Sequence, residues 1–288
     1  ATLRRQRQMC IRDSYNPEWT AEVVTLNRTE SGYRLAGKEG EIEEYVLKME
    51  NLPDRRFLSS LIKKKNAGPA DLSLAAVQLA NIHADSGMSV REGETGKAER
   101  FQALCDDMLY QMKRYFDPSI TQPIIDMIRH PLDKFIHSKS NVFGKRLRKG
   151  RVVQGHGALL PEHIHIQGET VRFLSPHEVY KKYSVLDAAH DVATLMVELI
   201  VANEKELADH FLQKYKEASK DKDLESILPA YQTYCALKHG VLTCERKVAL
   251  QDESLGPVAL EYFNLATRFS RTISNCLLYT SPSPRDCQ

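Results

Sequence analysis

The sequence predicts an α+β fold, and three observations carry that prediction. Residues 21–52 hold short β-rich runs separated by turn residues. Most of the remaining chain places apolar residues at the spacing of amphipathic helices. Between residues 151 and 174, three short β-rich runs interrupt the helical pattern. Strands, then helices, then a small hairpin-rich insert within the helices are typical of α+β proteins.

Both ends of the chain are expected to derive from sequencing adapters. Residues 4–14 (RRQRQMCIRDS) back-translate to DNA ending in AGAGACAG, and residues 276–286 (CLLYTSPSPRD) back-translate to its inverted repeat. Such repeats resemble the transposase adapters that are joined to DNA fragments before sequencing. Segments 1–14 and 276–288 are therefore excluded from the fold reasoning as artefacts. Residues 15–275 are expected to be an internal piece of a longer gene.

The composition of the interior predicts a cytoplasmic protein. The whole chain has 40 basic and 38 acidic residues and a formal charge of +2. Without the five basic and two acidic residues of the end segments, the charge becomes −1, so a nucleic-acid or membrane partner is not expected. The interior cysteines lack metal-ligand spacing and are expected to be buried thiols in a reducing compartment. They are Cys105, Cys235 and Cys244.

The elements follow in order along the chain. Strands are expected at 21–27 and 44–49, with turns at Ser31-Gly32 and 37–40. Asp71 is expected to cap the first turn of a helix over 71–83. Pro131 is expected to kink or split a helix over 123–149. The other expected helices are 98–116, 187–203, 204–219, 224–248 and 256–275, and the expected strands of the insert are 151–154, 164–167 and 170–174.

Six strings in this order resemble the aminoglycoside phosphotransferase family, which has a protein-kinase-like fold. They are EYVLKMENLPDRRFLSSLI, LSLAAVQLANIHA, GHGALLPEHIHI, VRFLSPHEV, DAAHDVATLMVEL and YQTYCALKHGVLTCERKV. The similarity covers residues 15–275 and is greatest to a bacterial group in which a P-loop ATPase domain follows this domain. The resemblance implies a partial small β lobe and interlobe linker over 15–52. It also implies a mainly helical large lobe over 53–275, with a short β-hairpin island.

The resemblance also implies a site for ATP and magnesium, and two of its key positions have changed. The family's catalytic loop reads HGD followed by four residues and Asn or His. Here His156 begins the loop, Ala158 occupies the Asp position and His163 the last position. The family's metal-binding Asp falls on Ser175, or on Leu174 if the register slips by one residue. Loss of a general base typically costs ~10²–10⁴-fold in rate, and loss of the metal carboxylate removes charge neutralisation as well.

The remaining candidate residues also come from the resemblance. Glu162 and Glu178 are the nearest carboxylates that could replace the missing ones. The linker residues Met49, Glu50 and Leu52 are expected to line an adenine pocket. Lys48 has the sequence context of the linker and is not expected to be the phosphate-pairing lysine.

Two aspartates complete the expected loop. Asp187 resembles the family aspartate that accepts hydrogen bonds from catalytic-loop amides. Asp191 is expected to support the turn or to cap the next helix.

Several clusters have a functional and a plain structural interpretation, and the structural one is favoured. The histidines near the loop do not match a known zinc spacing, so no metal site is expected. The lysines at 63–65 and the basic run 145–151 are interpreted as helix ends, where cations suit the helix dipole. The tyrosines at helical spacing are expected in the core: Tyr180, Tyr183, Tyr215, Tyr231, Tyr234 and Tyr262.

Two functions remain open. The first is a catalytically degraded phosphotransferase-like domain that binds a nucleotide, a small molecule or a neighbouring domain, such as a downstream P-loop ATPase domain. The second is an active ATP-dependent phosphotransferase of a small hydroxylated molecule that uses Glu162 or Glu178. The changes at Ala158 and Ser175 favour the first. A purely structural module for an attached ATPase is a more distant third.

Overall fold

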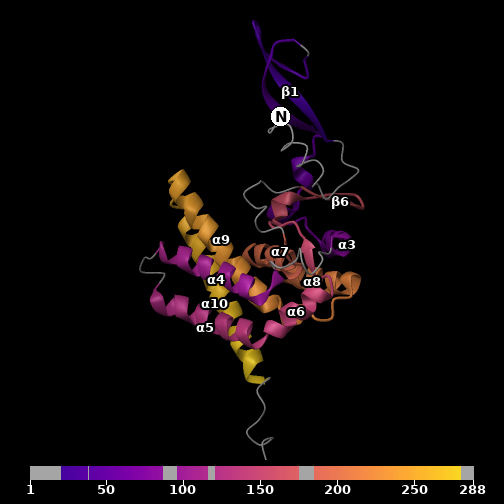
Figure 1. Ribbon diagram of the computed structural model, residues 1–288. Helices are drawn as coiled ribbons and strands as arrows, with labels where there is room; N and C mark the ends of the chain where they lie inside the picture. Colours follow the sequence, from indigo (N-terminus) through magenta and orange to yellow (C-terminus); the bar gives the residue numbers. More distant parts are fainter. Residues whose placement is uncertain (1–20, 38, 87–95, 116–120, 175–184, 280–288) are drawn as a thin grey trace, which may run out of the picture. The chain divides into compact units, whose positions relative to one another are not determined.

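The computed structural model describes residues 21–37, 39–86, 96–115, 121–174 and 185–279. Over these ranges the α+β class is confirmed, because small antiparallel sheets accompany a mainly helical structure (Figure 1). The chain forms two compact units. The first comprises the described parts of 1–67 and 161–177, and the second comprises the described parts of 68–160 and 178–288.

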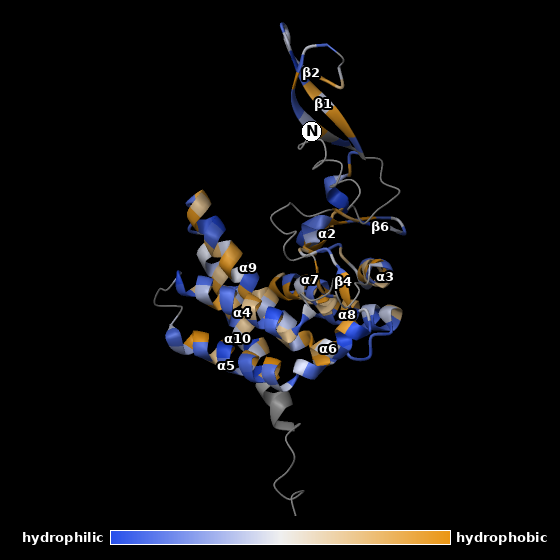
Figure 2. Cartoon of the chain, in the orientation of Figure 1, coloured by the Kyte–Doolittle hydropathy of each residue, from blue (hydrophilic) through white to orange (hydrophobic). Residues whose placement is uncertain are grey.

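The first unit contains a three-stranded antiparallel sheet of order β2-β1-β3. Its strands are β1 (Ala21–Thr29), β2 (Gly32–Leu35) and β3 (Glu41–Met49). Figure 2 shows apolar residues along the central strand β1, where Val24 is buried. The buried Asn27 donates hydrogen bonds from Nδ2 to the carbonyls of Gly37 and Glu39, at 3.2 and 3.1 Å, and so fixes the connection from β2 to β3.

A short helical segment and a hairpin complete the first unit. The segment contains a 3-10 turn, η1 (Asp54–Arg56), and α2 (Leu58–Lys63). The hairpin follows a second 3-10 turn, η3 (Pro161–His163), and consists of β5 (Ile164–Gln167) and β6 (Thr170–Phe173). Phe57 forms an isolated bridge to His165 of β5. Lys63 and Lys64 end α2, as the helix-end interpretation predicted.

The second unit is built from helices around the long helix α9. This helix packs against α4, α7 and α10, while α8 packs against α3 and α7, and α5 against α10. The helices are α3 (Pro69–Asp85), α4 (Ala98–Lys113), α5 (Gln122–Ser138), α6 (Ser140–Arg148), α7 (Ala189–Val201), α8 (Lys205–Ser219), α9 (Leu228–Leu250) and α10 (Leu255–Tyr279), with a 3-10 turn η5 (Leu224–Ser226) before α9.

The start of α3 agrees with the sequence prediction for Asp71. The carboxylate of Asp71 accepts a hydrogen bond of 2.9 Å from the backbone N–H of Gly68. Pro69 occupies the first turn, where its fixed φ suits the helix and its missing N–H leaves no backbone bond unmade. These two residues explain why the helix begins two residues before the predicted 71.

Pro131 was expected to kink or split the helix, and the structure shows no split at that residue. Helix α5 continues through Pro131 to Ser138, and the chain separates α5 from α6 at Lys139. The apolar stripe of α5 offsets the backbone hydrogen bond that proline removes. The buried residues of that stripe are Ile125, Ile128, Leu132, Phe135 and Ile136.

The predicted three-stranded insert divides between the two units. Strand β4 (Val152–Gln154) pairs antiparallel with β7 (Val185–Asp187), whereas β5 pairs with β6. The prediction had assigned Asp187 to a helix. The backbone N–H of Ala188 donates to the carbonyl of Arg151 at 2.9 Å, so the start of α7 is fixed beside the residue that precedes β4.

The core of the second unit contains the predicted thiols and aromatic rings. Cys105, Cys235 and Cys244 are free and buried. Four of the six tyrosines expected in the core are buried, namely Tyr215, Tyr231, Tyr234 and Tyr262. Tyr180 and Tyr183 lie outside the described residues. Over the described ranges, no helix combines the length and the apolar composition needed to cross a membrane.

Candidate functional site

The candidate site is the loop that follows β4, residues 155–160. The carboxylate of Asp191, in the first turn of α7, accepts hydrogen bonds from the backbone N–H groups of His156 and Gly157, at 2.6 and 2.9 Å. Gly157 has φ +77°, a conformation that favours glycine. The loop is therefore held in one shape by a buried carboxylate.

The sequence prediction assigned this role to Asp187, and that assignment is wrong. Asp187 ends β7, and its Oδ1 accepts the N–H of Ala189 at 2.9 Å. Its carboxylate also binds Arg146, at 2.6 Å from Nε and 2.8 Å from Nη2. Asp191 lies one helical turn later, which points its carboxylate at the loop amides.

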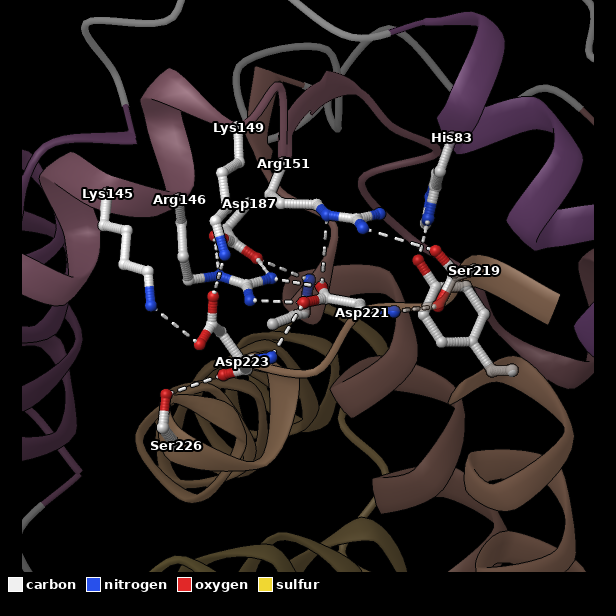
Figure 3. A network of polar contacts seen from close by, with 12 residues as sticks. His83, Lys145, Arg146, Lys149, Arg151, Asp187, Ser219, Asp221, Asp223 and Ser226 are labelled. Carbon is white, nitrogen blue, oxygen red and sulfur yellow. Dashed lines mark hydrogen bonds and ion pairs between the residues drawn. The ribbon is translucent and has the colours of Figure 1, made fainter. Parts of the chain in front are cut away.

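Arg146 connects Asp187 to a second carboxylate. Its guanidinium lies between Asp187 and Asp221 and bonds to the latter at 3.0 and 2.8 Å (Figure 3). Arg146 is fully buried, and both carboxylates are buried as well. Nearby, Lys145 and Lys149 form half-exposed ion pairs with Asp223, at 3.0 and 2.6 Å. The cluster is a structural ion network that fixes the turn into α7, and hence the position of Asp191.

Two buried polar side chains, His83 and Tyr215, form a hydrogen-bonded chain that ends at Asp191. Nε2 of His83, in α3, lies 3.2 Å from Oδ2 of Asp191. Nδ1 of the same ring lies 2.8 Å from the hydroxyl oxygen of Tyr215. Burial alone would raise the pKa of Asp191, but hydrogen bonds from His190 and His83 hold that pKa well below its usual range. Asp191 therefore remains a carboxylate that binds the loop.

Lys238 of α9 contacts the same loop from another side. Its Nζ donates to the carbonyl of Gly157 at 3.3 Å and lies 3.0 Å from His190 Nε2. Burial and the charge of Lys238 lower the pKa of His190 to about 4. Because Lys238 can only donate, the neutral imidazole accepts at Nε2 and carries its proton on Nδ1, 3.4 Å from Asp191 Oδ1.

The predicted site residues are distributed over both units. His156 and Ala158 belong to the loop of the second unit and are buried, with Ala158 1% exposed. Glu162 and His163 belong to η3 of the first unit, where Glu162 is exposed and His163 is half-buried.

The linker residues also belong to the first unit. Leu52 is buried. Glu50 is exposed, and its Oε2 lies 3.9 Å from Nη2 of Arg172. Met49 is the last residue of β3. Ser175 and Glu178 lie outside the described residues.

The sequence analysis missed Lys238, His190 and His83 as members of the loop network. Lys238 interrupts an otherwise apolar part of α9, and such an interruption is the signal that could have identified it. His83 and His190 also lie on buried helix faces. Local sequence does not reveal that these faces meet, because the contacts join residues up to 132 positions apart, as between His83 and Tyr215.

The loop does not suit the magnesium ion that the resemblance implies. Mg²⁺ prefers hard oxygen ligands, carboxylates above all. Residues 155–160 read GHGALL and carry no acidic side chain, and the nearest carboxylate, Asp191, is engaged with two backbone amides and His83. In the described part of the chain, no group of three or more His, Cys, Asp or Glu residues is arranged to hold a metal ion.

His165 is a separate buried polar residue in the first unit. Its ring packs edge-on against Phe57, with centroids 5.1 Å apart. Burial, and then the charge of Arg172, lower its pKa. His165 is therefore a neutral core histidine of the hairpin.

Sequence comparisons relate the chain to proteins of two mycobacteria. No protein-family model matches the sequence. Uncharacterized proteins of Mycobacterium tuberculosis and Mycobacterium bovis are 26% identical over 215 residues, which cover 74% of this chain and 43% of each relative. The chain thus spans less than half the length of these curated relatives.

Two solved structures share the architecture. A choline/ethanolamine kinase family protein from Mesorhizobium loti matches with a TM-score of 0.53 at 13% identity, over 88% of this chain and 76% of that one. Plasmodium vivax ethanolamine kinase matches with a TM-score of 0.51 at 14% identity, over 92% of this chain and 71% of that one. The chain has a protein-kinase-like fold. At this identity the likeness shows the fold alone.

Proposed function

We propose that this chain is a phosphotransferase-like domain, related to the aminoglycoside phosphotransferases, that binds a ligand without transferring phosphate. The observation that carries the proposal is Ala158. It occupies the expected position of the catalytic base, within a loop that Asp191 holds in shape. A methyl group can neither orient a hydroxyl nor accept its proton.

The support of the loop argues for retained binding. Asp191, His83, His190 and Lys238 are all buried and hydrogen-bonded around it. Such a network holds the loop's backbone in one conformation, which reduces the entropy cost of binding a ligand there. A nucleotide or a small hydroxylated molecule is the ligand class that the kinase-like fold favours. A neighbouring domain, such as a P-loop ATPase domain, is the partner that this module would regulate.

The test measures binding and transfer on the same protein. We expect ATP or ADP to raise the melting temperature, while radiolabelled ATP transfers no phosphate to a panel of small hydroxylated acceptors. ATP-dependent phosphorylation by the purified protein would contradict the proposal.

The double variant Glu162→Gln, Glu178→Gln then separates the two explanations. Loss of that phosphorylation in the double variant would establish the alternative, an active phosphotransferase with displaced carboxylates. Full turnover in the double variant would exclude both carboxylates and point to contamination or to another base.

A further inference from the structure

His165 of β5 is a buried side chain with unsatisfied polar atoms. The residue is 0% exposed, and among the described residues neither of its ring nitrogens has a hydrogen-bond partner. The carbonyl of Pro53 acts on the pKa of His165, but its geometry falls short of a hydrogen bond, and it already accepts the N–H of Arg56 at 2.9 Å. A buried donor without a partner is costly, and in native proteins such a donor generally meets an ordered water or an ion. The ring of His165 is therefore a candidate ligand contact.

Arg172 of β6 is the cross-strand neighbour of His165. Paired residues of an antiparallel hairpin project to the same face, with Cβ atoms about 4.5–5.5 Å apart. The Arg172 side chain is only 25% exposed, yet its one ion pair among the described residues joins Nη2 to Oε2 of Glu50 at 3.9 Å. A charge-assisted hydrogen bond of this type is about 2.7–2.9 Å long. Arg172 thus holds its donors beside the ring without a close acceptor.

The charges around the imidazole favour an anion. Arg172 and Arg56 lower the pKa of His165, whereas the charge of Glu50 raises it. Glu50 is the competing anion, but its side chain is 52% exposed, so water hydrates its carboxylate when it leaves Arg172. A phosphate group carries more charge than a carboxylate and presents three acceptor oxygens. It can therefore displace Glu50 from these donors.

We propose that Arg172 and His165 form a binding site for a phosphate group, with Glu50 as a weakly held competitor. The planar guanidinium binds two phosphate oxygens side by side, and the N–H of His165 donates to a third. The ring is closed to solvent in the free protein, so the long side chain of Arg172 turns as the phosphate enters. The inference goes beyond the proposed function, which requires neither residue. Free phosphate and a phosphomonoester share this chemistry.

Isothermal titration of the whole chain with inorganic phosphate, and separately with glycerol 3-phosphate, tests the inference. We expect Arg172→Gln to weaken phosphate binding by at least about tenfold, because it removes the charged donor. Arg28→Gln is the matched control. Arg28, on β1 of the same unit, also lies 3.9 Å from a glutamate, Glu43, and its loss should change binding by less than about twofold.

Glu50→Gln should have the opposite sign. It removes the competitor, so phosphate binding should tighten by about fivefold. Glu43→Gln is its control, because Glu43 is exposed to a similar degree, 47% against 52%, and it should change binding by less than roughly twofold. Equal tightening by both variants would reveal a general effect of net charge and overturn the inference.

His165→Leu separates binding from folding. The buried donor has no partner in the free protein among the described residues, so an apolar side chain of similar size should leave the melting temperature unchanged or higher. Phosphate binding should nevertheless weaken by about fivefold. A lower melting temperature with unchanged phosphate binding would show that the ring is only structural, and the inference would fall.

The two ligands identify the source of the phosphate group. Binding of inorganic phosphate alone identifies the free ion, whereas tighter binding of glycerol 3-phosphate identifies a phosphomonoester. If neither ligand binds, or if Arg28→Gln weakens binding as much as Arg172→Gln, the inference is overturned. Nucleotide binding is measured separately with ATP and ADP, so the proposed function stands or falls independently of this result.

Discussion

At the scale of single residues, two aspartates four positions apart carry the polar structure of the second unit. Asp187 binds the buried guanidinium of Arg146, and Asp191 binds the loop amides. Each carboxylate has a charged or hydrogen-bonding partner that offsets the cost of its burial. Neither aspartate takes part in chemistry with a ligand in the proposed function, so both are structural positions.

Arg146→Met is predicted to destabilise the protein by about 3–5 kcal/mol, because it leaves the buried carboxylate of Asp187 without its cation and that of Asp221 with only Arg151, whose Nε lies 3.8 Å away. Urea unfolding measures the change. Lys145→Met, on the same helix, is the control; its pair with Asp223 is half exposed and should contribute at most about 1 kcal/mol. Equal stability of the two variants would show that the buried cluster adds nothing to folding.

At the scale of elements, the contact of α9 with α10 depends on a glycine. A Cβ on Gly240 would lie 2.4 Å from a ring carbon of Phe263, which is buried. The ring cannot move freely in a packed core, so the two helices approach this closely because residue 240 has no side chain.

Gly240→Ala is therefore predicted to destabilise the protein by about 1–3 kcal/mol through overpacking, although alanine is the better helix former by ~1 kcal/mol. Gly144→Ala in α6 provides the opposite control, because its Cβ would meet its nearest atom, from the flexible Arg148, at 3.5 Å. Thermal unfolding should show a lower melting temperature for the first variant and an unchanged or higher one for the second. A stabilised Gly240→Ala would mean that the helices can separate at no cost.

Elements with their own periodicity could be predicted from sequence, and elements defined by distant partners could not. Helix α3 follows from apolar spacing and from Asp71, and its predicted limits differ by two residues at each end. Strand β7 has three residues and exists because it pairs with β4, over 30 positions away. Strand β2 is short and exposed throughout, so it shows no alternation of apolar and polar residues.

The candidate site divides in the same way. The expected loop is confirmed over residues 155–160, between β4 and η3, because its residues are local in sequence. That Ala158 replaces a catalytic Asp stays a prediction from the resemblance. The sequence analysis assigned the loop amides to Asp187, whereas the structure gives them to Asp191, which was expected to support the turn or to cap the next helix; which carboxylate faces the loop depends on how α7 starts after β7. Lys238 could not be assigned to the loop, because α9 meets it only through tertiary packing.

At the scale of the whole molecule, folding couples to pH through buried histidines. The pKa of His190 falls from 6.5 to about 4 on folding. Between these values the unfolded chain binds a proton that the folded chain does not, so stability rises with pH across this window. A shift of this size corresponds to roughly 3 kcal/mol. His165 contributes with the same sign, since burial lowers its pKa as well.

The measurement is the free energy of unfolding between pH 4 and pH 7, for the wild type and for His190→Asn. We expect the wild type to lose stability more steeply as pH falls below 6.5, and the difference between the two proteins to level off near pH 4. Groups whose pKa does not depend on His190 cancel in that difference, whereas Asp191, whose pKa His190 helps to lower, does not. Parallel curves would show that His190 is protonated equally in the folded and unfolded chain.

The separation between Asp191 and position 158 has an evolutionary consequence. The carboxylate that holds the loop and the carboxylate that would perform chemistry are different residues, on different segments. Under the proposed function, one substitution at position 158 removes the chemistry, while the hydrogen bonds from the loop amides to Asp191 are present with a buried Ala158. Selection for foldability does not oppose that step, so inactive descendants of such a scaffold should arise repeatedly and persist wherever binding alone is useful.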